Sequence, residues 1–166
     1  MKAVNFLDKL KEKEFFKDFE KKYPDSFLCA FFCTLNKEEK EGDKINIDFF
    51  VPSEKKIAFS ESPFSEIKFS EQEENKELKK MNNLKNLKID LEDLWDEVER
   101  EKKEKDIQHN TGKIISVLTT DCWNLTCLSD SLELLRIKID PFTKEILQTK
   151  KESLSDMIKI QKTDKK

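Results

Sequence analysis

The chain has 166 residues, of which 40% are charged and 36% hydrophobic, and its formal net charge is −3. Acidic residues and lysines are interleaved and only Arg100 and Arg136 supply guanidinium groups, which argues against binding to a nucleic-acid backbone, a function that needs concentrated positive charge. Thirteen phenylalanines argue against disorder, so the composition indicates a folded core under a heavily charged surface.

The first third of the chain predicts a helix followed by strands. Apolar residues at one-turn spacing begin a helix at Val4, and the imperfect register between Leu10 and Phe15 predicts a bend. Tyr23-Pro24-Asp25 ends this helix, since proline disfavours helix in the residue before it. Strands are then expected at 26–35, 44–51 and 56–60, and residues 64–69 are a candidate edge strand.

Residues 71–88 differ in character, because they are almost entirely Glu, Lys, Asn and Gln. Such a stretch is expected to be the linker between two halves. Leu78, Met81 and Leu84 give it a weak helical stripe, so we do not expect it to be fully disordered.

A second helix is expected from Asp90, whose side chain can cap the first free amides. Its apolar face consists of Leu91, Leu94, Trp95 and Val98. We expect Trp95 to be a main anchor of this helix and residues 99–106 to be its solvated extension, which ends around His109. Strands follow at 113–120, 122–128, 132–139 and 145–148, and a short helix capped by Ser153 closes the chain.

This order predicts an α+β fold in which helices pack on antiparallel sheet, because the hairpin turns are too short for parallel crossovers. We divide the chain into a first half at 1–70, a charged linker at 71–88 and a second half at 89–166, as two α-β-β-β-like repeats. An offset of 89 residues supports a duplication, since it places Pro52 on Pro141, Lys55 on Lys144 and Cys33 on Cys122. The alternative architecture is one continuous sheet shared by both halves.

The second half resembles the PepSY-like domains on two stretches. Trp123-Asn124-Leu125-Thr126 is a strand with an aromatic anchor, and residues 135–146 are similar to the family's "valine-aspartate-x-x-threonine-glycine-glutamate-valine" hairpin, with Lys144 in place of the glycine. Residues 50–57 resemble a degenerate second copy, so that the whole chain is similar to two-copy archaeal proteins of this family. The resemblance implies one helix on a small antiparallel sheet per copy, and an association with peptide binding and the restraint of peptidases.

The four cysteines are the only candidates for a metal site. Four thiolates suit zinc, but these spacings lack the two-residue knuckle that wraps the metal, and Cys122 and Cys127 are expected on opposite faces of a strand. We therefore interpret Cys29, Cys33, Cys122 and Cys127 as buried, reduced thiols and expect no metal and no cofactor.

No catalytic centre is recognisable in the sequence. His109 is the single histidine, and it lies in the polar segment that ends the second helix, where we expect it to be exposed and inert. The sequence indicates neither the nucleophile nor the orienting group that a catalytic base requires. Two glycines, Gly42 and Gly112, are too few for a phosphate-binding loop. Trp123 remains a candidate binding residue, because it can lie on either face of its strand.

The function expected from these observations is non-catalytic binding of a protein or peptide by a monomer or dimer. The alternatives are a small acidic chaperone-like dimer, or a small ligand-binding protein or enzyme with a pocket between helix and sheet. The sequence shows no apolar run long enough for a signal peptide or a membrane span, so we expect a cytoplasmic protein that binds neither nucleic acid nor membrane.

Overall fold

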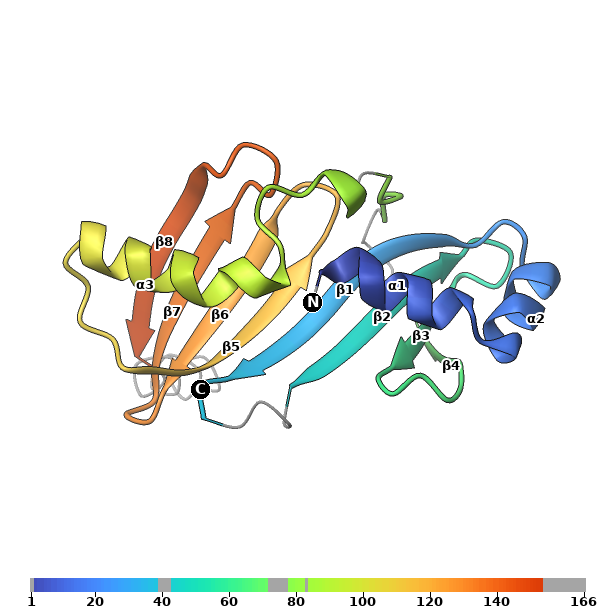
Figure 1. Cartoon of the computed structure of the whole chain (residues 1–166), viewed down its shortest axis with the longest axis horizontal. Coiled ribbons are helices and arrows are strands. Elements are labelled where there is room, and N and C mark those ends of the chain that lie inside the picture. The colour runs from blue at the N-terminus through green and yellow to red at the C-terminus, as the bar shows by residue number, and fades with distance from the viewer. Residues whose placement is uncertain (1, 39–42, 72–77, 83, 154–166) are drawn as a thin grey trace, which may run out of the picture.

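Eight antiparallel strands form one continuous sheet in the computed structural model, which describes residues 2–38, 43–71, 78–82 and 84–153. The spatial order is β4-β3-β2-β1-β5-β6-β7-β8, so β1 and β5 join the halves at the centre (Figure 1). The strands are β1 Phe27–Asn36, β2 Lys44–Val51, β3 Lys56–Glu61, β4 Lys68–Glu71, β5 Thr111–Leu118, β6 Trp123–Ser129, β7 Glu133–Ile139 and β8 Ile146–Ser153.

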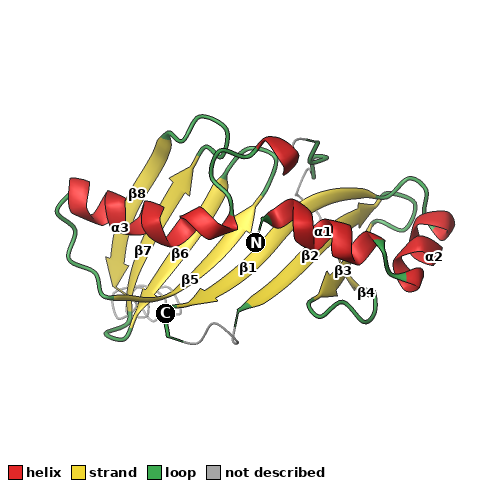
Figure 2. Ribbon diagram, in the orientation of Figure 1, coloured by secondary structure: helices red, strands yellow, loops and turns green. Residues whose placement is uncertain are grey.

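The helices that the structure describes all lie on one face of this sheet (Figure 2). They are α1 Ala3–Lys11, α2 Glu14–Lys22, the 3-10 turns η2 Leu84–Asn86 and η3 Leu91–Asp93, and α3 Leu94–Glu104. The expected bend in the first helix separates α1 from α2 at residues 12–13. Among the described residues, no helix is long and apolar enough to cross a membrane.

The α+β class with an antiparallel sheet is thus confirmed, and the continuous sheet is the architecture observed. Each half contributes four strands, so that the candidate edge strand after residue 64 and the expected strand after residue 145 are both present, as β4 and β8. Lys55 and Lys144, which the 89-residue offset aligns, both adopt positive φ, at 52° and 70°. The turns that hold them join β2 to β3 in one half and β7 to β8 in the other, however, so the offset does not relate equivalent strands. The internal duplication stays a prediction.

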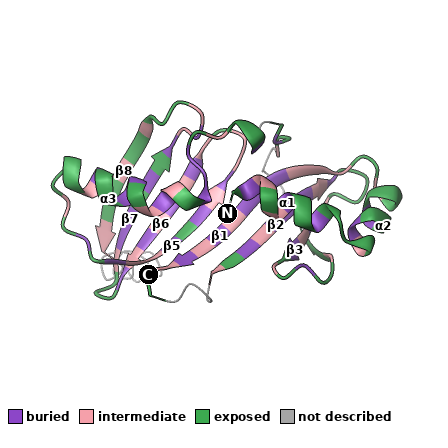
Figure 3. Ribbon diagram, viewed as in Figure 1, coloured by how far each residue is buried: buried purple, intermediate pink, exposed green. Residues whose placement is uncertain are grey.

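The core lies between the helices and the face of the sheet that they cover (Figure 3). Side chains alternate across a strand, so β2 sends Ile45, Ile47 and Phe49 into the core and Asn46 and Phe50 to the opposite face. The same alternation in β6 buries its odd-numbered residues. One face of the sheet is therefore packed, and the other carries the remaining half of the strand side chains.

The described part of residues 71–88 contributes to this core. Met81 and Leu84 are buried in the core cluster. The Met81 backbone N–H donates to the Leu28 carbonyl at 2.9 Å, and Thr120 donates to the Lys80 carbonyl at 2.9 Å. The weak apolar stripe therefore fastens the described part of this segment to both halves. At the other end of the chain, Ser153 is the last residue of β8, and the expected terminal helix lies outside the described residues.

The predicted solvated extension of the second helix is wrong at one position. Glu101 is 2% exposed, and its Oε1 accepts from Lys105 Nζ at 2.7 Å and from Thr149 Oγ1 at 2.9 Å. A buried carboxylate requires such partners. This carboxylate ties α3 to the edge strand β8, a contact that a helical pattern of charges does not reveal.

Asp90 links the N-terminal ends of α1 and α3, which meet near the centre of the sheet (Figure 1). Its Oδ1 accepts from the backbone N–H groups of Ala3 and Leu91, both at 2.7 Å. The Asp93 carboxylate in turn accepts from the Asp90 N–H at 2.9 Å, which completes a capping box. One buried carboxylate therefore satisfies the amides of two helices from different halves.

We expect Asp90→Ala to lower the free energy of unfolding by about 2 kcal/mol, because it leaves two buried N–H groups without an acceptor. Asp90→Asn retains an oxygen acceptor and is the matched control, with a smaller loss. Urea denaturation followed by circular dichroism measures both. Equal stability of the alanine variant and the wild type would show that the two helices do not depend on this side chain.

Candidate functional site

Trp123, the candidate binding residue, belongs to the core. Its side chain is fully buried, and its indole Nε1 donates to the Ile89 carbonyl at 2.8 Å. It therefore anchors β6 to the segment that leads into α3 and offers no surface to a partner.

Trp95 is only half-buried, contrary to the expectation that it is a main core anchor. Together with Phe6 and Leu91 it lines a cleft of about 690 Å³ between α1, η3 and the central strands. Leu94 and Val98 of the same helix are fully buried and hold α3 on the sheet in its place. Trp95 is thus less buried than expected, and Trp123, whose face had been left open, is the tryptophan of the core.

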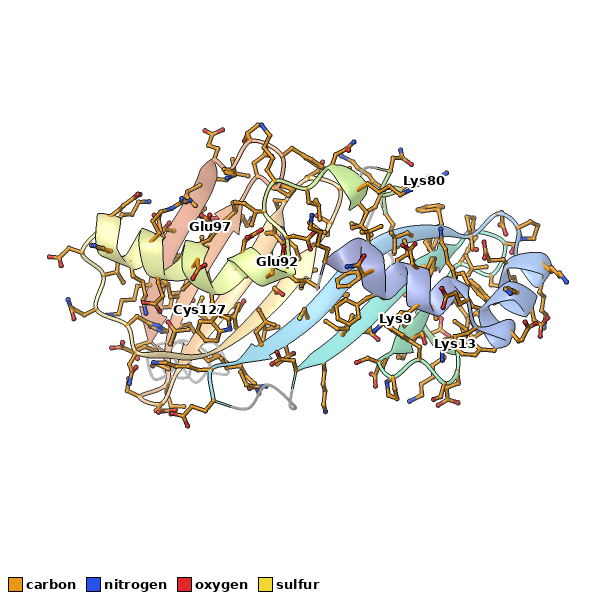
Figure 4. All side chains as sticks on the ribbon, in the orientation of Figure 1. Lys9, Lys13, Lys80, Glu92, Glu97 and Cys127 are labelled. Carbon is orange, nitrogen blue, oxygen red and sulfur yellow. The ribbon has the colours of Figure 1, made fainter. Side chains whose placement is uncertain are left out.

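The cysteines do not gather into a metal site within the described residues, where no group of three or more potential ligands is found. Cys29, Cys33 and Cys127 are buried, and Cys122 is half-buried. Cys127 lies on the sheet close to α3 (Figure 4). Burial raises the pKa of Cys29, Cys33 and Cys127 to about 12, so these three are protonated, unreactive thiols at neutral pH.

We expect Cys122 to be the first thiol to react with 5,5′-dithiobis(2-nitrobenzoate) in the native protein. The other three react only after unfolding, because they are buried and protonated. Absorbance counts the thiols that react before and after urea is added, and Cys122→Ser is the control that removes the fast phase. Any thiol of that variant that still reacts rapidly before urea is added would contradict this assignment.

His109 is buried and holds a loop, contrary to the expectation that it is exposed. Its Nε2 lies 3.0 Å from the Glu133 carbonyl, which only accepts, and its Nδ1 lies 2.7 Å from Thr111 Oγ1. A neutral ring with the proton on Nε2 satisfies both partners. Lys102 Nζ also donates to the His109 carbonyl at 2.7 Å. The histidine therefore connects the end of α3 to β7.

The face of the sheet opposite the helices carries a set of apolar side chains that we name the aromatic patch. None of them belongs to the core cluster or packs against it, and all are at least partly exposed. Cross-strand register places them beside one another: Phe27 opposite Phe50, Phe50 opposite Ile57, and Phe32 opposite Val117. The members of the patch are Phe27, Phe32, Phe50, Ile57, Phe59, Ile115 and Val117.

The aromatic patch spans four neighbouring strands, β3, β2, β1 and β5, and thus the junction of the two halves. The rings of Phe27 and Phe50 lie 5.6 Å apart in an edge-to-face arrangement. Among the described residues, no helix covers this face (Figure 2). Ile115 is exposed and the other six are partly exposed, and apolar surface gathered in this way is typical of interaction sites.

A carboxylate lies within the aromatic patch. Asp48 faces Phe59 across the β2–β3 ladder and Ala30 across the β1–β2 ladder, and its side chain is 9% exposed. Asn46 Nδ2 donates to it at 2.6 Å, while the buried Oδ1 of Asn46 has no hydrogen-bond partner in the described part of the chain. Burial raises the pKa of Asp48 to about 6, against the smaller opposing effect of the Asn46 hydrogen bond.

Comparison with known proteins gives a shared fold. The sequence matches no family model and no curated protein. The structure is similar to the crystal structure of a predicted lipoprotein from Clostridium difficile 630, with a TM-score of 0.50, 13% sequence identity, and coverage of 82% of this chain and 90% of that chain. At this identity the similarity shows the fold alone.

Proposed function

We propose that this protein is a non-catalytic module that binds another protein through the aromatic patch. The observation that carries the proposal is the position of seven apolar side chains on the face of the sheet that no described helix covers. In register, Phe27 lies opposite Phe50, Phe50 opposite Ile57, and Phe32 opposite Val117. Aromatic side chains are enriched in protein–protein interfaces and supply much of their binding energy. The PepSY-like resemblance supports the proposal, and we include in it that the halves are degenerate PepSY-like copies.

The side chains that could take part in catalysis, the histidine and the cysteines, support binding rather than catalysis. The histidine is committed to two structural hydrogen bonds, and three of the four thiols are buried and protonated. A folded partner is favoured over a single added strand, because the patch extends across four strands. An extended peptide on a sheet edge contacts one strand only.

The proposal is tested by affinity capture from the native host with three proteins: the wild type, Phe50→Ser and Leu147→Ser. Leu147 is an exposed apolar residue on β8, 49% exposed, and serves as the matched control outside the patch. We expect the same protein to be recovered by the wild type and Leu147→Ser, and at least ten-fold less of it by Phe50→Ser. Recovery of no protein, or equal recovery by all three, would contradict the proposal.

The cleft beside Trp95 supports the rival function, since its volume of about 690 Å³ is that of a small-molecule site. A metabolite recovered in place of a protein, and lost in Trp95→Ala, would favour a ligand-binding protein. Comparison of Phe50→Ser with Trp95→Ala therefore separates the two functions, because the two substitutions lie on opposite faces of the sheet.

A further inference from the structure

Asp48 is an unusual residue for its position. Aspartate is disfavoured in strands, and here it lies in the middle of β2 among Ile and Phe residues. Among the described residues none of the ion pairs involves Asp48, and its carboxylate accepts a hydrogen bond from the neutral amide of Asn46. A buried carboxylate without a cation costs folding free energy and calls for a reason outside the fold.

The immediate surroundings of Asp48 are suited to a positive charge. The ring of Phe59 lies directly opposite, and Phe50 follows two residues along the strand on the same face. Aromatic rings attract cations through their negative faces, most strongly where water is excluded. The buried Oδ1 of Asn46, which has no hydrogen-bond partner in the described part of the chain, adds a partial negative charge beside the carboxylate. Apart from the Asn46 amide, which donates to the carboxylate, these groups favour a positive charge and none of them supplies one.

We propose that the aromatic patch receives an arginine or lysine side chain of the partner protein, which Asp48 neutralises within the frame of phenylalanine rings. This inference rests on the proposed function and specifies the chemistry of the partner: a surface with one basic side chain surrounded by apolar ones. The partner's ammonium or guanidinium group donates to the Asp48 carboxylate, and its aliphatic stem lies against the rings. The charge pair gives specificity, and the rings give contact area.

Ionisation of Asp48 governs this contact. The charged side chains nearest to it on the same face are all exposed: Lys44 at the start of β2, Glu61 on β3 and Lys68 on β4. From β1, the Cys29 thiol donates to the backbone carbonyl of Asp48 at 3.5 Å. Only the ionised carboxylate attracts the cation. Because burial raises the pKa of Asp48 to about 6, binding is expected to weaken about ten-fold between pH 7 and pH 5.

The probe is a set of peptides selected from a random library displayed on phage, with the wild-type protein immobilised and with counter-selection against Phe50→Ser. We expect the selected peptides to contain a basic residue flanked by apolar residues. One peptide is then synthesised with arginine and with citrulline, which has nearly the same shape but no charge. Affinities of both peptides are measured by isothermal titration calorimetry for the wild type, Asp48→Asn and Glu152→Gln.

The expected result is a coupling between the two charges. Asp48→Asn weakens binding of the arginine peptide at least ten-fold and leaves binding of the citrulline peptide within two-fold. Glu152→Gln, which removes a carboxylate at the far edge of the same face, changes neither more than two-fold. Three outcomes would overturn the inference. They are selected peptides without an excess of basic residues, the absence of any selected peptide, and additive effects of Asp48→Asn and of the arginine-to-citrulline change on the binding free energy. Apolar peptides that depend on Phe50 alone would overturn it and leave the proposed function standing.

Discussion

Trp123→Ala is expected to lower the free energy of unfolding by about 3–5 kcal/mol, the loss typical of a buried tryptophan. The indole is fully buried, and its removal also leaves the Ile89 carbonyl without its donor at 2.8 Å. A loss of this size is a large part of the whole stability of a domain. Urea denaturation followed by far-ultraviolet circular dichroism measures it.

Trp95→Ala is the matched comparison, because it removes the same side chain from a half-buried position at the cleft. We expect it to lower the free energy of unfolding by about 1–2 kcal/mol, since only the buried part of the ring contributes. Trp123→Phe, which keeps most of the volume but not the hydrogen bond, should lie between the two. A Trp95 variant less stable than the Trp123 variant would reverse the assignment of core anchor.

Asp48→Asn is expected to increase the free energy of unfolding at pH 8 by about 2–3 kcal/mol. The ordinary pKa of the carboxyl is 3.8 and burial raises it to about 6 in the folded protein. Below pH 3.8 the carboxyl is protonated in both the folded and the unfolded state, so its burial as a charged group does not lower the free energy of unfolding. Between pH 3.8 and 6 the folded state binds more protons than the unfolded state, so stability falls as pH rises, and above pH 6 the full cost is present.

The measurement is urea denaturation of the wild type and Asp48→Asn at pH 4 and pH 8. The two proteins should differ little at pH 4 and by the full amount at pH 8, with the variant more stable. Glu61→Gln, a change at an exposed carboxyl on the neighbouring strand, should alter stability by about 0.5 kcal/mol or less. An Asp48→Asn variant that is less stable at pH 8 would mean that the carboxylate stabilises the fold.

The arrangement of helices and strands was predictable, because it depends on local patterns. Alternation identified β2 over its observed range of Lys44–Val51, and Asp90 was recognised as the start of the second helix from its capping chemistry. The single sheet was not decided by the sequence, since the pairing of β1 with β5 joins residues about 80 apart. Local periodicity contains no information about that contact.

Tertiary contacts explain the errors over individual side chains. Trp95 lies on the apolar face of its helix, but that face crosses the edge of a cleft, while Trp123 is buried because β6 turns its odd-numbered residues inward. His109 follows a polar stretch, yet the Glu133 carbonyl from a distant strand accepts a hydrogen bond from its Nε2. Each of these positions is determined by a partner far away in the chain.

The aromatic patch was missed, although a sequence signal for it exists. The phenylalanines at 27, 32, 50 and 59 read as core because strands in this chain are apolar on both faces. The lone Asp48 inside Ile45-Asn46-Ile47-Asp48-Phe49-Phe50 marks the second face, since a period of two puts it opposite the core. A polar residue inside an aromatic strand therefore deserves separate examination when a sheet is assigned.

The most direct test of the binding face is photo-crosslinking in the native host. A benzoylphenylalanine is placed at Ile115, which is 38% exposed on the central strand β5 and on the face opposite the described helices, or at Trp95 on the helix-covered side. We predict that a partner protein is crosslinked at Ile115 and that none is crosslinked at Trp95. A partner crosslinked at Trp95 alone, or at neither position, would contradict binding through the aromatic patch.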